Sequence, residues 1–328
     1  MIRPSLALAF RLTAAILAVC LVLAAAPAPA GPSAADSQPV RLAYLQNDLH
    51  HLALWIALDK GFFSEEGLPV EVAGIFRSGP ELMTAFGAGE LDAAYVGQAP
   101  ATIAAVRGTA RIKVLAQANT EGSALVGSKA LAEGKVPRPT LAIPGHGGVQ
   151  ELLLQKALPT LGLSADGVEL VVVSPPEMLP ALQSGQIDGF IAWEPYPARA
   201  VLQAIGTTIA NSTAIWAGHP CCVLAAADDL IDKRPAVARS LIRAHGKATR
   251  YIADHPEEAL AVAVKYTGMD EDVARRAMAH VTYVETPSLV GEEEYVRFLI
   301  TRGVIKVEDA AAFTRSFIDL PTREAAAR

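Results

Sequence analysis

The sequence predicts an α/β protein of two lobes, each built on an open and mainly parallel sheet. The main observation is a repeat without gaps, since residues 80–100 correspond to residues 176–196 in order and spacing. Both stretches begin with Pro-Glu and later carry a glycine followed by an aspartate three residues on. A repeat of this kind indicates two copies of one structural unit. The alternative is that two β-α-β segments resemble each other through patterning alone.

Each copy is predicted to fold as a strand, a helix and a second strand. A serine precedes each helix, a proline lies in its first turn, and a glycine follows its end. Two strands joined by one helix within so short a segment form a right-handed parallel crossover. The predicted strands are residues 70–76 and 93–96 in the first copy, and 168–173 and 189–192 in the second.

Ligands of open α/β sheets bind beyond the carboxyl ends of the strands. The matched positions at those ends are Ser78 with Ser174 and Gln98 with Glu194. We therefore expect these two pairs to face a ligand from opposite lobes.

The N-terminus has the features of a signal peptide, predicted over residues 1–30. Arg3 and Arg11 give a basic start, residues 12–26 form an apolar run, and residues 24–26 or 28–30 supply small side chains for cleavage. Cys20 leaves a lipoprotein form open, although bulky Val19 and the apolar sequence after Cys20 favour a cleaved soluble form. We expect an exported protein, with residues 31–39 as a disordered Pro/Ser-rich lead.

Composition excludes one class of partner. Cleavage near Ala30 removes two basic residues and no acidic one, so the formal net charge falls from −6 to −8. An acidic chain is poorly suited to nucleic acid, which calls for a basic face. Only two cysteines remain after cleavage, so disulfides do not hold the fold, and the remaining length favours two domains.

The other elements follow from apolar periodicity and from Gly and Pro signals. Further strands are predicted at residues 41–45, 111–116, 125–127, 140–143, 207–210 and 219–225, and a hinge at 119–123. Helices are predicted at residues 51–63, 101–107, 149 onward, 235–254, 256–267, 270–280, 292–302 and 307–317, with the region after 228 entirely helical.

Residues 51–68, which include Lys-Gly-Phe-Phe and Glu-Glu-Gly-Leu, resemble the first helix of the solute-binding proteins of nitrate/sulfonate/taurine-type ABC importers. The turn at residues 89–92 and the strand end at residues 193–196 are similar to that family too. The resemblance implies a type II periplasmic-binding-protein fold with a two-strand hinge, a small-molecule ligand, an ABC permease as partner and a periplasmic location. It also implies that lobe 1 is discontinuous, with residues 40–122 and 218–328, and that lobe 2 is residues 123–217.

Polar side chains recur in the loops that should meet at one rim, which is what a cleft binder needs. The glycine-rich turn at residues 144–148 opens a helix, whose free N–H groups attract an anionic or polar ligand. Trp193 either offers an aromatic wall or ends a core strand. The predicted ligand-binding residues are Gln46, Asn47, His50, His51, Ser78, Gly79, Gln98, His146, Gly147, Gly148, Ser174, Trp193, Glu194, His219, Cys221 and Cys222.

Cys221 and Cys222 are adjacent, which leaves three interpretations open. They form a vicinal disulfide, they remain thiols that bind a soft metal beside histidines, or they are small buried residues of a strand. The histidines come from separate loops without the spacing of a metal site. We therefore expect no metal and no cofactor.

No catalytic motif is present, since the chain lacks Gly-x-Ser-x-Gly, His-Glu-x-x-His and a P-loop. Thiamine-pyrimidine synthases resemble this chain at the cysteines, but Val96 and Pro100 replace the lysine and histidine that those enzymes need. We predict a non-catalytic binding protein, with a metal-binding or synthase-like protein that uses the cysteines as the alternative. The ligand stays open among a sulfonate, a nitrate-like anion, an organosulfur compound and a thiamine precursor. Arg77 is the one nearby cation, and the acidic residues Asp48, Glu177 and Glu194 fit an uncharged, zwitterionic or amine-bearing molecule at least as well as an anion.

Overall fold

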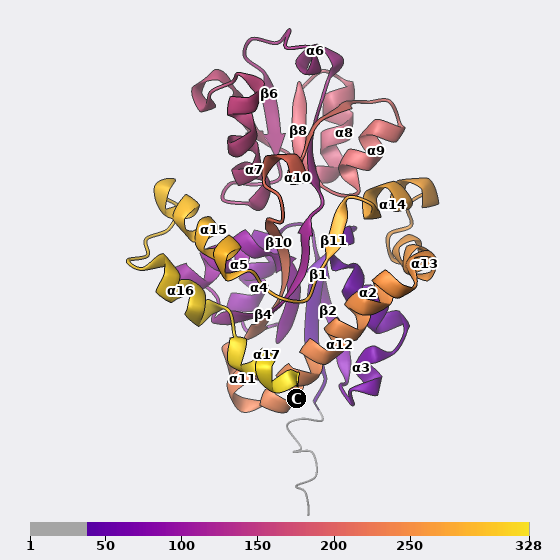
Figure 1. Cartoon of the computed structure of the whole chain (residues 1–328), viewed down its shortest axis with the longest axis vertical. Helices are drawn as coiled ribbons and strands as arrows, with labels where there is room; N and C mark the ends of the chain where they lie inside the picture. Colours follow the sequence, from indigo (N-terminus) through magenta and orange to yellow (C-terminus); the bar gives the residue numbers. More distant parts are fainter. Residues whose placement is uncertain (1–37, 328) are drawn as a thin grey trace, which may run out of the picture. The chain divides into compact units, whose positions relative to one another are not determined.

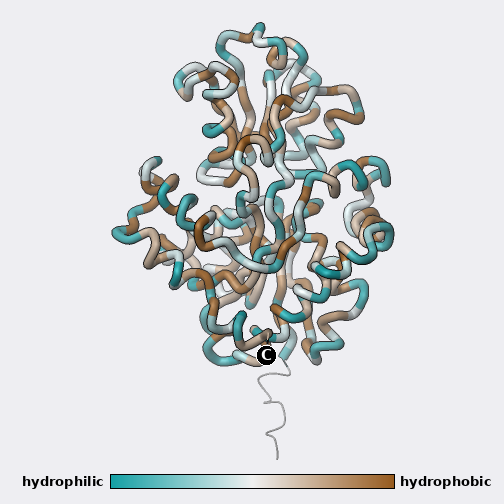
Figure 2. Tube along the Cα trace, in the orientation of Figure 1, coloured by the Kyte–Doolittle hydropathy of each residue, from teal (hydrophilic) through white to brown (hydrophobic). Residues whose placement is uncertain are grey.

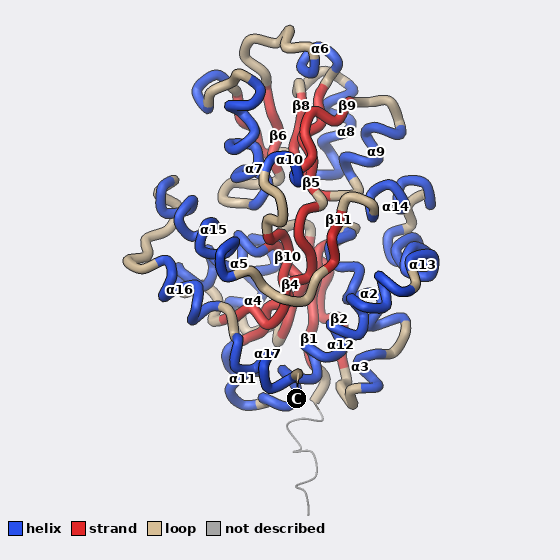
Figure 3. Tube along the Cα trace, in the orientation of Figure 1, coloured by secondary structure: helices blue, strands red, loops and turns tan. Residues whose placement is uncertain are grey.

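The computed structural model describes residues 38–327, so the predicted signal peptide and most of the predicted disordered lead lie outside the described residues. The described chain contains two sheets separated along the molecule (Figures 1 and 3). The six-stranded sheet has the order β11-β4-β10-β3-β1-β2 and the five-stranded sheet the order β7-β6-β8-β5-β9. The first comprises β1 Val40–Leu45, β2 Val70–Phe76, β3 Ala93–Gly97, β4 Ile112–Glu121, β10 Pro220–Ala227 and β11 Val281–Tyr283. The second comprises β5 Ser123–Gly127, β6 Thr140–Ile143, β7 Glu169–Val172, β8 Gly189–Trp193 and β9 Thr207–Asn211.

Helices cover both sheets. Around the first sheet lie η1 Leu49–His51, α2 Leu52–Asp59, α3 Phe62–Glu65, α4 Gly79–Gly87, α5 Gln98–Arg107, α11 Asp228–Lys233, α12 Pro235–Asp254, α13 Pro256–Thr267, α14 Glu271–Met278, α15 Leu289–Thr301, α16 Ala310–Phe317 and α17 Leu320–Ala326. With the second sheet lie α6 Lys129–Ala132, α7 Val149–Ala157, η2 Leu158–Leu161, η3 Ala165–Gly167, α8 Pro175–Gln183, α9 Tyr196–Leu202 and α10 Ser212–Ile215. None of the helices in the described part combines the length and apolar character needed to cross a bilayer.

The two copies of the repeat fold into the same unit. In the first copy β1 lies between β2 and β3 and pairs with both in parallel. In the second copy β6 lies between β7 and β8, again in parallel with both. The predicted mixed α/β architecture is thereby confirmed, but the sheets are not mainly parallel, because five of the nine strand pairs in the described part are antiparallel.

The repeated aspartate closes each unit onto its central strand. Asp92 accepts a hydrogen bond from the backbone N–H of Arg41 at 2.9 Å, and Asp188 accepts one from Thr140 at 2.8 Å. Each aspartate also donates its own N–H to the carbonyl of the same strand residue, at 2.8 Å in both copies. The glycines before them turn the chain with φ of +75° and +74°, a region that favours glycine.

The chain passes between the sheets at two places. β4 continues into β5 through Gly122, whose φ is +81°, and β9 returns through α10 to β10. The predicted hinge at residues 119–123 is therefore mostly strand, because β4 runs on to Glu121. Figure 2 shows hydrophobic residues along the strands, whereas the outer helices alternate between hydrophilic and hydrophobic residues. Trp55, fully buried on α2, stacks on Tyr266 of α13 at 5.7 Å.

Two predictions of secondary structure are wrong. The helix expected over residues 51–63 is broken near Gly61, which adopts φ +76° before α3 begins. The region after residue 228 is not entirely helical, because residues 281–283 form β11 at the edge of the six-stranded sheet. Three residues between two helices are too short a run to show a strand period.

Candidate functional site

A cavity of about 800 Å³ lies between the ends of the two sheets. Its wall from the first sheet comes from the ends of β1 and β3, the start of β10, and helices α4 and α5. Its wall from the second sheet comes from the turn after β6, the start of α7, and Trp193 at the end of β8. Arg302 and Val304, after α15, complete it.

Nine of the predicted ligand-binding residues line this cavity. They are His50, Ser78, Gly79, His146, Gly147, Gly148, Trp193, Cys221 and Cys222. The other seven lie outside the lining, and they are Gln46, Asn47, His51, Gln98, Ser174, Glu194 and His219. Strand-end position alone therefore does not decide which side chain reaches the cavity.

The matched positions Gln98 and Glu194 are buried and occupied by partners from the C-terminal region. Gln98 donates to the carboxyl of Glu292 on α15, and Thr102 donates to the same group at 2.7 Å. Glu194 accepts from His280 at 2.6 Å and from the N–H of Ala198 at 3.0 Å. The matched serines also differ, because Ser78 caps α4 whereas the Ser174 hydroxyl donates to Glu177.

The glycine-rich turn forms as predicted, but the backbone N–H of Gly147 is hydrogen-bonded within the protein and does not face a ligand freely. Gly147 donates to the carboxylate of Glu151 in the first turn of α7, at 2.6 Å. His146 projects outward from the same turn, with its side chain 67% exposed. A ligand at this wall would therefore meet the imidazole of His146 and the remaining backbone groups.

Two cations that sequence reasoning missed line the cavity. Arg107 ends α5 and donates to the carbonyl of Val304 at 2.9 Å, and Arg302 follows α15 with Glu151 at 3.9 Å. The expectation that Arg77 is the one nearby cation is wrong, because its side chain does not line the cavity. Both arginines occur at helix ends, where lysine and arginine are common for reasons of helix stability, so sequence gave no distinguishing signal.

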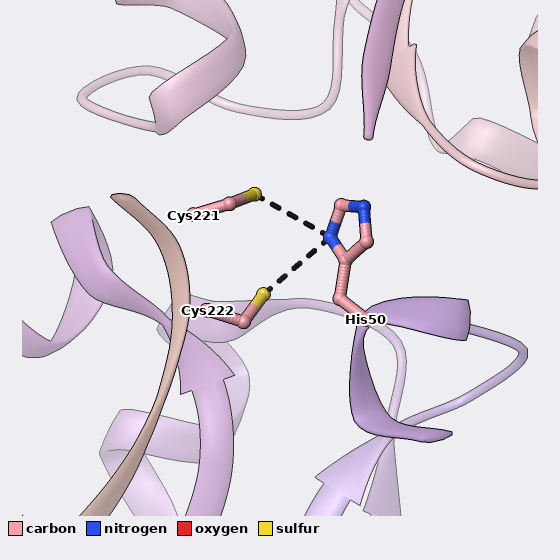
Figure 4. A group of neighbouring side chains, drawn as sticks. All are labelled: His50, Cys221 and Cys222. Atoms are coloured by element: carbon pink, nitrogen blue, oxygen red, sulfur yellow. Dashed lines mark hydrogen bonds between the residues drawn. The ribbon is translucent and has the colours of Figure 1, made fainter. Parts of the chain in front are cut away.

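Two short segments meet at the wall formed by the first sheet. Asp48 to His51 follow β1, and His219 to Cys222 enter β10. The Sγ atoms of Cys221 and Cys222 lie 3.4 and 3.7 Å from Nδ1 of His50, as Figure 4 shows. Both cysteines are free thiols and almost fully buried. The vicinal disulfide is therefore absent from the described part of the chain.

Charges in this group perturb one another. Burial opposes a charge on His50, but the negative charges of Cys221 and Asp48 raise its pKa to about 9. A hydrogen bond from Cys222 lowers the pKa of the Cys221 thiol well below its ordinary value, with help from His50 and His219, although burial acts the other way. Burial raises the pKa of the Cys222 thiol, and the neighbouring Cys221 raises it further.

Asp48 connects the two histidines. Its Oδ1 accepts the backbone N–H of His50 at 3.1 Å, and its Oδ2 lies 3.7 Å from Nε2 of His51. Burial raises the pKa of Asp48 to about 7, and burial together with His50 lowers the pKa of His51 to about 3. His51 is therefore neutral, and its Nδ1 accepts the N–H of Leu45 at 3.2 Å.

Two mixed α/β sheets with a cavity between their ends are typical of the periplasmic-binding-protein folds. The model of the NMT1-like family matches residues 33–267, and the chain belongs to that family. The resemblance to solute-binding proteins of nitrate/sulfonate/taurine-type importers is thereby confirmed.

Relatives of known description support this placement. The nitrate/nitrite binding protein NrtA of Synechococcus elongatus is 26% identical over 83% of this chain and 70% of its own length. The nitrate import ATP-binding protein NrtC of the same species is 34% identical over 69% of this chain, but the chain spans only 37% of its length. The crystal structure of the periplasmic nitrate-binding protein NrtA from Synechocystis superposes with a TM-score of 0.80 at 18% identity, covering 88% of each chain.

Proposed function

We propose that this chain is an exported, non-catalytic solute-binding protein that holds a small molecule in the cavity and delivers it to an ABC permease. The observation that carries the proposal is the cavity of about 800 Å³ lined from both sheets. A ligand held by residues of both sheets stabilises the arrangement in which they face each other, and such closure is how a binding protein signals occupancy. The NMT1-like family and the nitrate-binding relatives agree with this function.

We propose a small anion, nitrate-like or a sulfonate, as the solute. The guanidinium groups of Arg107 and Arg302 line the cavity, and arginine binds planar and tetrahedral oxyanions through paired N–H groups. His146 adds a third nitrogen donor from the wall of the second sheet. The volume is ample for an alkyl chain as well as for the acid group.

A thermal-shift screen of the mature protein against nitrate, alkanesulfonates, organosulfur compounds and thiamine pyrimidines tests the proposal. A true ligand at a hundredfold its dissociation constant adds about 2.7 kcal/mol to the free energy of unfolding. Arg302→Gln should weaken binding of an anion about tenfold or more, since a charge-assisted hydrogen bond contributes about 1.5–3 kcal/mol. Arg77→Gln is the matched control, because Arg77 is outside the cavity lining and should leave affinity unchanged.

The proposal fails if no solute shifts the unfolding transition, or if Arg77→Gln and Arg302→Gln weaken binding equally. Export is tested separately by determining the N-terminus of the protein recovered from the periplasm. A start near residue 31 supports cleavage of the predicted signal peptide, and retention of Met1 in the cytoplasmic fraction contradicts it.

A further inference from the structure

The anion binding proposed above rests on Arg107, Arg302 and His146, and does not use the group formed by His50, Cys221 and Cys222, here called the Cys-His cluster. Its residues come from segments 171 and 172 positions apart, yet their side chains meet in a fully buried part of the cavity wall. All three line the cavity, and their ligand atoms lie within 4.8 Å of one another (Figure 4). Two thiols and an imidazole in a buried wall are an unusual lining for a site that recognises only an oxyanion.

The distances match the edges of a tetrahedral metal site. With metal–sulfur bonds of about 2.3 Å and metal–nitrogen bonds of about 2.0–2.1 Å, a tetrahedron places sulfur and nitrogen about 3.6 Å apart. The observed separations of Nδ1 of His50 from the two Sγ atoms are 3.4 and 3.7 Å. An ion can therefore contact the three ligand atoms with little movement of the side chains.

The imidazole of His50 is oriented for coordination. Its Nε2 lies 2.9 Å from the carbonyl oxygen of Gly122, which can only accept a hydrogen bond. Nε2 therefore carries a proton, and Nδ1 points between the sulfurs, where its lone pair becomes available once its own proton leaves. Metal-binding histidines characteristically donate their other N–H to a backbone carbonyl in this way.

A fourth nitrogen is close in sequence and lacks a partner. Nδ1 of His219 donates to the carbonyl of Trp216 at 3.0 Å, which leaves the lone pair on Nε2. His219 is fully buried, and Nε2 has no hydrogen-bond partner among residues 38–327. A buried acceptor without a donor costs free energy unless an additional group satisfies it.

We propose that Cys221, Cys222 and His50 bind one soft metal ion, Zn(II) or Cu(I), with the fourth coordination position directed to the cavity or, once its side chain moves closer, taken by His219. Thiolate and imidazole ligands select these ions over the hard cations that carboxylates prefer. Binding releases to solvent the protons that the thiols and Nδ1 of His50 hold, and no electron is transferred. The inference goes beyond solute transport, since the site needs no organic ligand.

Titration of the mature, reduced and metal-free protein with Co(II) and Zn(II) tests the site. Co(II) should produce thiolate-to-metal charge-transfer absorption at one ion per chain, and Zn(II) should displace it. Cys221→Ser, Cys222→Ser and His50→Gln should each weaken Zn(II) binding by about 100-fold or more, because removal of even a group that only hydrogen-bonds to a metal ligand costs about 10- to 100-fold. His146→Gln is the matched control, since this exposed histidine lines the same cavity outside the cluster.

Circular dichroism and the metal-free unfolding transition of each variant establish that it folds. If a serine variant does not fold, blocking both thiols of the wild-type protein with a small alkylating reagent should abolish Co(II) absorption. The proposal is overturned if folded wild-type protein gives no charge-transfer band, or if the His146 control loses affinity as the cluster variants do. The solute screen contains no metal, so its failure and the failure of this site are distinguishable.

Discussion

The two copies of the repeated unit share their backbone but differ in the residue that follows the last strand. After β3 the first copy carries Gln98, an amide that bonds to the buried carboxyl of Glu292. After β8 the second copy carries Glu194, a carboxylate that accepts from His280. Both partners come from the C-terminal region. Each copy therefore contacts that region, the first through an amide–carboxyl hydrogen bond and the second through a histidine–carboxylate pair.

This difference separates what a repeat preserves from what it leaves free. The aspartate of the turn is the same in both copies because it makes the same backbone bonds to the central strand, and the glycine is the same because both turns need a positive φ. The side chains that follow the last strand make no bond to the central strand. Their residue types therefore differ between the copies, according to the partners that they contact. Substitutions of three glycines and two aspartates test the backbone of the two copies through the free energy of unfolding. The pairs Gln98–Glu292 and Glu194–His280 test their side chains through the pH dependence of stability.

The largest expected effect is at the connection between the copies. A Cβ at Gly122 would lie 2.3 Å from Nε2 of His50 and 2.9 Å from Val281, at φ +81°. We expect Gly122→Ala to lower the free energy of unfolding by about 3 kcal/mol or more, since strain and steric overlap add. Urea unfolding followed by circular dichroism measures it.

The turn glycines of the two copies are the controls for this substitution. Gly89 and Gly185 have φ of +75° and +74°, and a Cβ there meets no atom of the described chain within 4 Å. Gly89→Ala and Gly185→Ala should each cost about 1–2 kcal/mol, from backbone strain alone. An equal loss for all three substitutions would contradict the importance of the contact at Gly122.

The turn aspartates should differ in size of effect. Asp92 accepts from the backbone N–H of Arg41 and from its guanidinium at 3.1 and 2.7 Å, whereas Asp188 accepts the backbone N–H of Thr140. We expect Asp92→Ala to cost about 2–3 kcal/mol and Asp188→Ala about 1–2 kcal/mol. Chemical unfolding of both variants at neutral pH measures the difference.

The loss at Asp92 should also depend on acid. Partial burial alone would raise its pKa, but the bonds from Arg41 lower it. Its contribution is therefore present above the pKa of the unfolded chain and disappears as the pH falls through the folded pKa. If the difference in free energy of unfolding between wild type and Asp92→Ala stays constant as the pH is lowered, Arg41 does not bind the ionised carboxylate.

Local sequence signals predicted the bounds of several strands and helices correctly. Strands β2 and β6 and helices α12 and α13 begin and end where the apolar pattern, glycines and prolines placed them. These signals are local, because proline and glycine act on their own φ. The pattern failed where a tertiary contact decides the structure, as at β11, whose few residues become a strand only by pairing with β4.

The same reason limits prediction of the site. Nothing local to Gln98 shows that Glu292, 194 positions later, will bury its amide. Nothing at Arg302 shows that it will reach a cavity formed by the preceding strands. The adjacent cysteines were conspicuous in the sequence, and His50 was predicted to face the same cleft. That His50 is the histidine in contact with both of them could be identified only once the fold had brought β1 and β10 into one sheet.

The stability contributed by the contact between Gln98 of the first copy and Glu292 should depend on pH. Burial raises its pKa to about 8, so the folded protein binds a proton that the unfolded chain has released above its ordinary pKa of 4.5. Stability therefore falls as pH rises between these values, by about 1.4 kcal/mol per pH unit for one proton. From pH 6 to 7 the wild type should lose about that much more than Glu292→Gln. Parallel stability curves for the two proteins would show that Glu292 is ionised in the fold.

The fastening of the second copy should give the smallest effect, since His280 is partly exposed and its ion pair with Glu194 is open to screening. The hydrogen bond to Glu194 raises the pKa of His280, although desolvation opposes it. Its contribution is complete below the unfolded pKa and is lost as pH rises through the folded value. His280→Gln should therefore lower stability by under about 1 kcal/mol at a pH below the unfolded pKa, and by less once the pH exceeds the folded pKa. His255→Gln, an exposed histidine with its own glutamate neighbour, is the control. If both histidine variants show the same pH dependence, the contact between the second copy and the C-terminal region is no stronger than an ordinary surface pair.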